Sequence, residues 1–375
     1  MRRLFLLALF AGLLYIAKPI WEEPVSKIVD LSFFDTIDEQ VNTLLNNQSV
    51  HTAVQYIRDT ADKAALFISS PSVDQEKLAP DVKIPILEKP PSGEIAIHNI
   101  VLGSSEENVR TELGDPQRVS VNEYGTEWET YHDRYHNFVM ISFDELRNVN
   151  AIYTNDRLIS TSAGIQYGSS KSDVRTAFGD PIKEIRKGLH IFILQDSEEY
   201  DVFKSGDTYT YVFYDLHKND TVTAVQLISA SLERRKAGIY AGGNDALRKG
   251  FEQQLFDLTN AARVRNGLSV LQWDELVSGT ARKHSEDMAV KNYFSHTNQE
   301  GKSPFDRMQY DGILFSSAGE NLAYGQPSSI FAHEGLMNSE GHRKNILQGH
   351  FSHLGTGVAF NEKSQPYYTE KFFSK

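Results

Sequence analysis

The hydrophobic pattern at the start of the chain is one short apolar block behind a positive edge. Arg2 and Arg3 precede an unbroken apolar run over residues 4–17. A positive first segment followed by such a run is the pattern of a secretion signal. The run is short for a membrane span, which needs about 20 apolar residues, but residues 19–21 after Lys18 could extend it to the membrane interface. We therefore predict a signal peptide or membrane anchor over residues 1–21, with cleavage left open.

The next pattern has a helical period. Between Ile37 and Ile68 apolar residues recur at near-helical spacing among polar ones, which predicts one or two amphipathic helices. Residues 69–93 then contain many prolines and little periodicity, as is typical of a semi-rigid linker. We therefore expect a helical stalk and a proline-rich linker over residues 22–93, with a domain boundary at its end.

An internal repeat with a constant offset of 65 residues follows. Residues 103–116 have the sequence GSSEENVRTELGDP, and residues 168–181 have GSSKSDVRTAFGDP. In each copy a serine can cap a short helix, which the Gly-Asp-Pro motif ends. Aromatic-rich strand segments follow both helices, at 138–152 and 209–228. The pattern predicts two α+β units with an antiparallel sheet, forming a domain over residues 94–235.

The last third of the chain begins with a second helical pattern. Asn244 can cap a helix whose buried stripe is Leu247, Phe251, Leu255, Leu258 and Ala262, ending at Arg263. A further helix is predicted from Asp274 to Lys291, and a strand from Leu354 to Phe360. His284 and His333 are expected at a helix surface or at the edge of the core.

Charge and cysteine content exclude several functions. The chain has 38 Lys+Arg against 50 Asp+Glu and no dense basic block after its first residues. Nucleic acid is therefore excluded as an expected partner, because phosphate binding needs clustered positive charge. The absence of cysteine excludes thiol catalysis, cysteine-ligated metal and disulfides. An exported chain without disulfides is compatible with a bacterial envelope.

Four short motifs lie in order along the last third of the chain. They are YFSHT at 293–297, GENLA at 319–323, NSEGHRKNIL at 338–347 and YYTEKF at 367–372. Together with Asn260, Leu271 and Trp273, they resemble the CAP superfamily, also called SCP-like or PR-1-like, in its Bacillus type. The repeat region, over about residues 97–230, resembles the domain that precedes CAP domains in Bacillus-type secreted proteins.

The resemblance implies a fold and a site. The fold is α+β, with residues 245–375 as an α-β-α sandwich in which a small antiparallel sheet lies between helices, after the two-repeat domain and the N-terminal signal or anchor helix. The site is a polar groove where His296, Glu320 and His342 converge. In this family His296 and His342 would be the histidines and Glu320 the first acidic residue.

The second acidic residue of the family pattern has no exact counterpart here. Leu336 stands where tryptophan is usual, and Ser339 stands where the second glutamate would fall. The adjacent Glu340 is our candidate for the groove. Glu334, one helical turn upstream of Ser339, is the alternative.

Two chemical interpretations of this groove remain open. His296, His342 and a carboxylate could hold a divalent metal such as zinc beside a water molecule, with Glu320 as ligand or general base. They could equally form a hydrogen-bonded network without metal, in which Glu320 orients a histidine and raises its pKa. Beyond these groove residues, the sequence identifies no catalytic residues for a hydrolase.

The resemblance favours binding over catalysis, because lipid, metal and protein binding are described in the superfamily and catalysis for few members. We therefore expect an exported protein, secreted or attached to the outer face of the membrane through its N-terminal segment. It would bind an envelope ligand (lipid, glycan or peptide) or a protein partner. A metal-dependent hydrolase and a structural envelope or spore protein are the alternatives.

Overall fold

The computed structural model describes residues 82–187, 190–194 and 197–375. The predicted signal or anchor, the amphipathic helices and the linker up to residue 81 lie outside the described residues. Within the described ranges, no helix is both long enough and apolar enough to cross a membrane.

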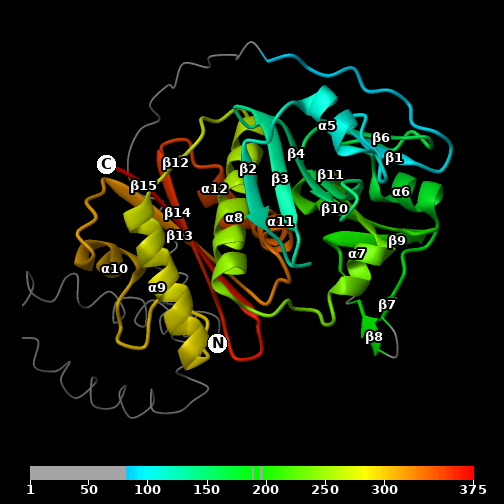
Figure 1. Ribbon diagram of the computed structural model, residues 1–375. Coiled ribbons are helices and arrows are strands. Elements are labelled where there is room, and N and C mark those ends of the chain that lie inside the picture. The colour runs from blue at the N-terminus through cyan, green and yellow to red at the C-terminus, as the bar shows by residue number, and fades with distance from the viewer. Residues whose placement is uncertain (1–81, 188–189, 195–196) are drawn as a thin grey trace, which may run out of the picture. The chain divides into compact units, whose positions relative to one another are not determined.

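The repeat region forms one antiparallel sheet to which both repeats contribute (Figure 1). Its strands are β2 (Arg118–Val121), β3 (Glu127–Asp133), β4 (His136–Phe143), β5 (Val149–Thr154), β9 (Tyr200–Ser205), β10 (Thr208–Asp215) and β11 (Thr221–Ser229). They lie in the order β2-β3-β4-β5-β11-β10-β9. The last strand of each repeat meets the other, because β5 pairs with β11 from Ala151 opposite Ile228 to Thr154 opposite Val225.

Short elements complete this domain. They are β1 (Ile95–Ile97) paired with β6 (Ile159–Thr161), β7 (Glu184–Lys187) paired with β8 (His190–Ile193), η1 (Leu216–Lys218) and α7 (Ala230–Arg235). The repeated motif folds as predicted into α5 (Glu106–Leu113) and α6 (Lys171–Phe178). Ser105 and Ser170 cap these helices, and Gly114 and Gly179 end them at φ 74° and 83°, a conformation that favours glycine.

Both faces of the seven-stranded sheet are buried. Successive side chains of a strand point to opposite faces. Along β4, Val139 and Ile141 therefore share a core with Val109 of α5. Phe138 and Met140, on the other face, share a core with residues of the C-terminal domain, including Leu258 and Ile330. The repeat domain thus uses the C-terminal domain to cover half of its sheet.

The C-terminal domain is an α-β-α sandwich, as predicted. Its elements are α8 (Asp245–Arg265), β12 (Gln272–Trp273), α9 (Glu275–Lys291), α10 (Pro304–Tyr310), β13 (Ser317–Tyr324), α11 (Ser329–Asn338), α12 (Glu340–Ile346), β14 (His353–Phe360) and β15 (Pro366–Ser374). The sheet order is β12-β14-β15-β13. Its three long strands are antiparallel as expected, whereas the short β12 runs parallel to β14. The predicted helix α8 continues to Arg265, one half turn beyond the expected end.

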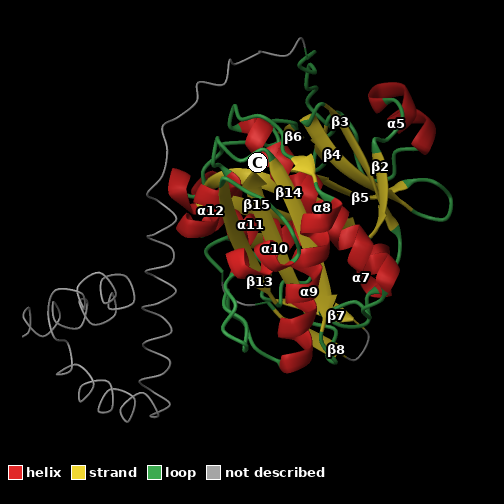
Figure 2. Ribbon diagram, turned by 90° about the vertical axis from the view of Figure 1, so that its left-hand side faces the viewer, coloured by secondary structure: helices red, strands yellow, loops and turns green. Residues whose placement is uncertain are grey.

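The sandwich follows from the alternation of side chains along β14 and β15. Leu354 and Tyr368 pack with α8, α11 and α12, whereas Phe373 and Tyr367 pack on the side of α9 and α10. Figure 1 shows α8 between the two large sheets, and Figure 2 shows the strands β13–β15 among the helices that cover them. Helix α8 is therefore the common wall of both domains.

Helix α9 lies so close to β14 that glycine is required at the contact. A Cβ atom on Gly357 would lie 2.0 Å from the main-chain nitrogen of Arg282, and one on Gly355 would lie 2.4 Å from that of Ser278. Forcing a methyl group into a packed core costs about 1–3 kcal/mol. We expect Gly357→Ala to lower the free energy of unfolding by that amount in urea titrations. Gly341→Ala, where a Cβ atom meets nothing within 4 Å, is the control, and an equal loss in both variants would contradict this packing.

Candidate functional site

The carboxylate of Glu320 is held by two buried cations. Glu320 on β13 faces Lys371 on β15 in the strand register. The Lys371 ammonium donates to Oε2 of Glu320 at 2.6 Å. Arg307 of α10 donates through Nη2 to both carboxylate oxygens, at 3.2 and 2.9 Å. All three side chains are buried.

His296 completes this network at the protein surface. Its Nδ1 lies 2.9 Å from Oε1 of Glu320, and a quarter of its side chain (25%) is exposed. An ionised carboxylate only accepts hydrogen bonds, so Nδ1 carries a proton, and in a neutral ring Nε2 remains an acceptor. Arg307 also donates to the main-chain oxygen of His296 at 2.8 Å. One guanidinium therefore fixes both His296 and Glu320.

The protonation states follow from burial and charge. Burial alone would raise the pKa of Glu320, but Lys371 and Arg307 together hold that pKa well below its usual range. Burial lowers the pKa of Lys371 to about 8, although the Glu320 carboxylate opposes this shift. At neutral pH the carboxylate is therefore ionised and surrounded by cations, which suits it to orienting His296 rather than to taking up a proton.

His342 is connected to this region through Asn321, the neighbour of Glu320. Because side chains alternate along β13, Asn321 points to the opposite face. Its Nδ2 donates to the main-chain oxygen of His342 at 3.1 Å and to Glu370 at 3.0 Å. Asn345 of α12 donates to the main-chain oxygen of Glu320 at 3.3 Å. The structure thus brings His296 and Glu320 into contact and lays α12 against β13, while the convergence of the His342 side chain on them stays a prediction.

The two candidates for the second groove carboxylate have different surroundings. Glu340 is exposed at the start of α12 and pairs with Lys344 at 2.6 Å. Glu334 is buried, and its Oε1 accepts from the Tyr153 hydroxyl of the repeat domain at 2.6 Å. Neither partner belongs to the Glu320 network, and the role of Glu340 in the groove stays a prediction.

Two other histidines correct the sequence prediction. His284 and His333 are 1% and 0% exposed, so the expectation of a helix surface or core edge was wrong. His284 Nε2 lies 3.0 Å from the main-chain oxygen of Ser295, next to His296. Burial lowers the pKa of His284 to about 4. This neutral ring holds the loop that carries His296.

The charged residues that sequence reasoning missed are Arg307, Lys371 and Glu370. Glu370 is buried, accepts from Thr259 at 2.7 Å, and has its pKa raised to about 7 by burial. Lys371 and Glu370 lie in the YYTEKF motif, where a Glu-Lys pair interrupts a strand of aromatic residues. That interruption was the signal in the sequence that could have identified Glu370 and Lys371 as buried charged residues. Arg307 has none in the sequence.

The donor set does not fit a metal site that uses Glu320. Within the described ranges, no group of three or more His, Asp or Glu side chains is arranged to hold a metal ion. Both oxygens of Glu320 already accept from Arg307, and Oε2 also accepts from Lys371. A divalent cation there would displace buried cationic partners. Ligation by His296 and His342 stays a prediction.

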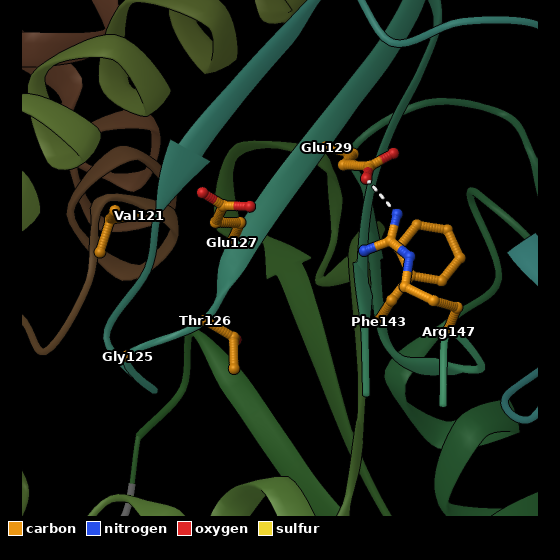
Figure 3. A pocket seen from close by; sticks show the side chains of 7 residues that line it. All are labelled: Val121, Gly125, Thr126, Glu127, Glu129, Phe143 and Arg147. Atoms are coloured by element: carbon orange, nitrogen blue, oxygen red, sulfur yellow. Dashed lines mark hydrogen bonds and ion pairs between the residues drawn. The ribbon is translucent and has the colours of Figure 1, made fainter. Parts of the chain in front are cut away.

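A second candidate region is a cavity of about 330 Å³ in the repeat domain (Figure 3). It is lined by Val121, Gly125, Thr126, Glu127, Glu129, Phe143 and Arg147. Arg147 lies over the Phe143 ring and donates to Glu129 at 3.0 Å, and Glu129 also pairs with Arg110 at 2.7 Å and accepts from Tyr131 at 2.6 Å. The buried carboxylate of Glu129 in the cavity wall is thus balanced by Arg110 and Arg147 of the same domain.

The second repeat contains the same type of arrangement. Arg175, the counterpart of Arg110 at the repeat offset, donates to both oxygens of Asp201 at 2.9 Å. Tyr214 donates to the same carboxylate at 3.0 Å. The repeated arginine therefore ties each short helix to the sheet through a carboxylate and a tyrosine, which is a structural role.

Family comparisons agree with this architecture. Residues 102–239 match the family model described as CAP-associated N-terminal, and residues 256–372 match the CAP model, described as the Cysteine-rich secretory protein family. The chain therefore belongs to the CAP superfamily and carries a CAP domain behind a CAP-associated N-terminal domain.

Three similar proteins place the chain among bacterial relatives. The uncharacterized membrane protein YlbC of Bacillus subtilis is 28% identical over 325 residues, which is 82% of this chain and 90% of that protein. The uncharacterized protein YkwD of the same species is 45% identical over 125 residues, 33% of this chain and about half (48%) of YkwD. The crystal structure of an extracellular protein containing a SCP domain from Bacillus anthracis superimposes with a TM-score of 0.62 at 29% identity, covering 73% of this chain and 94% of that one.

Proposed function

We propose that this protein acts outside the cytoplasm as a ligand-binding CAP protein. Its site around His296 and Glu320 would contact a lipid, glycan or peptide of the cell envelope, or a partner protein. The observation that carries this proposal is the Glu320 carboxylate, which accepts hydrogen bonds from Arg307 and Lys371 and so serves to fix the partly exposed His296. A fixed imidazole with one free acceptor is a recognition group.

The location is supported by the sequence and by relatives. The positive, apolar N-terminal segment has the pattern of an export signal or anchor. One relative is named a membrane protein and a similar solved structure an extracellular protein. An attachment to the outer face of the membrane, or secretion, agrees with both names.

The hydrolase alternative would require Glu320 to act as a general base, which its cationic surroundings oppose. A general base works best with a pKa near the operating pH, whereas Lys371 and Arg307 hold the pKa of Glu320 well below its usual range against the effect of burial. The structural-protein alternative predicts instead that no small ligand binds at all. Binding is therefore the better supported function.

The test compares His296→Ala with His190→Ala, an exposed histidine of the repeat domain. The probes are purified cell-wall glycan, phospholipid vesicles and a defined peptide mixture, each with and without zinc. We expect the intact protein to bind one probe and His296→Ala to bind it about tenfold more weakly, the equivalent of about 1.4 kcal/mol for one lost hydrogen bond. His190→Ala should bind normally.

Two outcomes contradict the proposal. Zinc-dependent cleavage of a peptide that requires both His296 and His342 would make the protein a hydrolase. Equal binding by the intact protein and by His296→Ala would remove His296 from the site.

A further inference from the structure

The repeat domain contacts the junction between α11 and α12 at Asn338 and Ser339, one helical turn before His342. Asn338, the last residue of α11, accepts from the main-chain nitrogen of Leu216 at 3.1 Å and donates to the main-chain oxygen of Tyr214 at 3.0 Å. Nε2 of His217 lies 2.9 Å from the main-chain oxygen of Asn338. The turn at residues 214–217, here called the junction turn, is therefore joined to the end of α11 by three hydrogen bonds.

An ion pair joins the same turn to α12. Arg343 donates through Nη1 and Nη2 to the two oxygens of Asp215, at 3.1 and 2.9 Å. The pair is mostly buried, with 14% of the Arg343 side chain and 5% of the Asp215 side chain exposed. Arg343 also donates to the main-chain oxygen of Met337 at 3.0 Å. Planar, two-point pairing of this kind fixes orientation as well as distance.

Helix α12 needs such support to keep its orientation. It has only 7 residues, and its N-cap Ser339 makes no side-chain capping bond. Helices this short depend on tertiary contacts, because isolated helices below about 12 residues are marginal in water. Asn321 of β13 holds α12 through the main-chain oxygen of His342. Asp215 of the repeat domain holds it through Arg343.

The remaining interface keeps the two domains together independently of this ion pair. Arg118 pairs with Asp257 at 2.7 Å, and a Cβ atom on Gly250 of α8 would lie 2.1 Å from the main-chain oxygen of Val121. Phe331 of α11 contacts the rings of Tyr200, Tyr211 and Phe213. Loss of the Asp215 contact is therefore expected to loosen α12 without separating the domains.

We propose that the CAP-associated domain positions the CAP site, with Asp215 and the junction turn setting the orientation of α12 and hence of His342 relative to β13. Asp215, Asn338 and Arg343 are positioning residues, and the repeat domain is an intramolecular partner of the groove. This inference deepens the proposed binding function and rests on His342 belonging to that site, but its test needs no ligand.

The test uses Asp215→Asn in the full chain, with Asp201→Asn as the matched control. Asp201 is also buried and also pairs with an arginine through both oxygens, but its partner Arg175 lies inside the repeat domain. We measure amide hydrogen exchange along α12 and the imidazole signals of His342 and His296 through a pH titration. In Asp215→Asn, exchange in α12 is expected to rise about tenfold, the His342 titration to shift, and His296 to stay unchanged.

The charge-reversed double variant Asp215→Arg/Arg343→Asp should restore slow exchange in α12, which a general loss of stability would not allow. The inference is overturned if α12 and His342 behave in Asp215→Asn as in the intact protein, or if Asp201→Asn changes them equally. If Asp215→Asn leaves α12 unchanged while His296-dependent binding is observed, only the positioning role is refuted. If Asp215→Asn changes α12 as expected but no probe binds the intact protein, only the binding function is refuted.

Discussion

Replacing Glu320 by alanine is expected to lower the free energy of unfolding by about 3–5 kcal/mol. The variant leaves Lys371 (0% exposed) and Arg307 (8% exposed) without their common counter-charge. Removing one partner of a buried ion pair has this cost because the other charge stays desolvated and unpaired. Urea unfolding of the full chain, with equal slopes in both proteins, measures it.

The control is Glu340→Ala, which removes an exposed glutamate paired only across the surface with Lys344. Exposed ion pairs contribute little to stability because water and salt screen them, so this variant should match the intact protein closely. The double variant Glu320→Ala/Lys371→Met should lose less than Glu320→Ala, since one stranded cation is removed. Equal stability of Glu320→Ala and Glu340→Ala would show that Glu320 does not anchor the site.

The elements that the sequence predicted are those with a local cause. The serine caps and glycine ends of α5 and α6 lie within one short motif, and the apolar stripe of α8 lies on one helix. These local patterns predict where a helix begins and ends or which of its residues are buried. They do not predict which other element packs against the helix. The apolar stripe of α8 therefore gives no sign that Glu252 and Asp257 are buried as well, which they are because that helix lies between two sheets.

The candidate site also combines features that the sequence predicts with features that depend on tertiary packing. The resemblance to a family identified His296 and Glu320, and their contact is present at 2.9 Å. The partners that decide what Glu320 can do come from 13 and 51 residues away, Arg307 and Lys371. Asp215 and Arg343 are 128 residues apart in different domains. Contacts at such separations depend on the packing of whole elements, which no local period or spacing encodes.

The second large effect expected is a pH-dependent gain in stability from Glu334→Gln. Glu334 lies on α11 at the domain interface, where burial raises its pKa to about 7 although Tyr153 and Arg265 oppose the shift. A carboxyl with a folded-state pKa above its ordinary value of 4.5 contributes stability that is complete below pH 4.5. That stability is lost as the pH rises through 7, because the folded chain must then hold an unfavourable buried charge.

Glutamine is neutral at every pH, and its side-chain oxygen can still accept from the Tyr153 hydroxyl, which lies 2.6 Å from Oε1 of Glu334. The free energy of unfolding of the variant should therefore match that of the intact protein near pH 4.5 and exceed it by up to about 3 kcal/mol at pH 8, where the raised pKa of about 7 makes the ionised Glu334 destabilising. Urea titrations at the two pH values measure the difference. The exposed Glu340→Gln provides the control.

A constant difference between Glu334→Gln and the intact protein at both pH values would contradict the buried charge. The cost comes from the burial of the charged carboxylate, since the hydrogen bond from Tyr153 and the charge of Arg265 both favour the ionised form. The helix that leads to the junction before His342 thus contains a buried carboxyl whose ionisation opposes folding, and Glu334→Gln removes that dependence on pH.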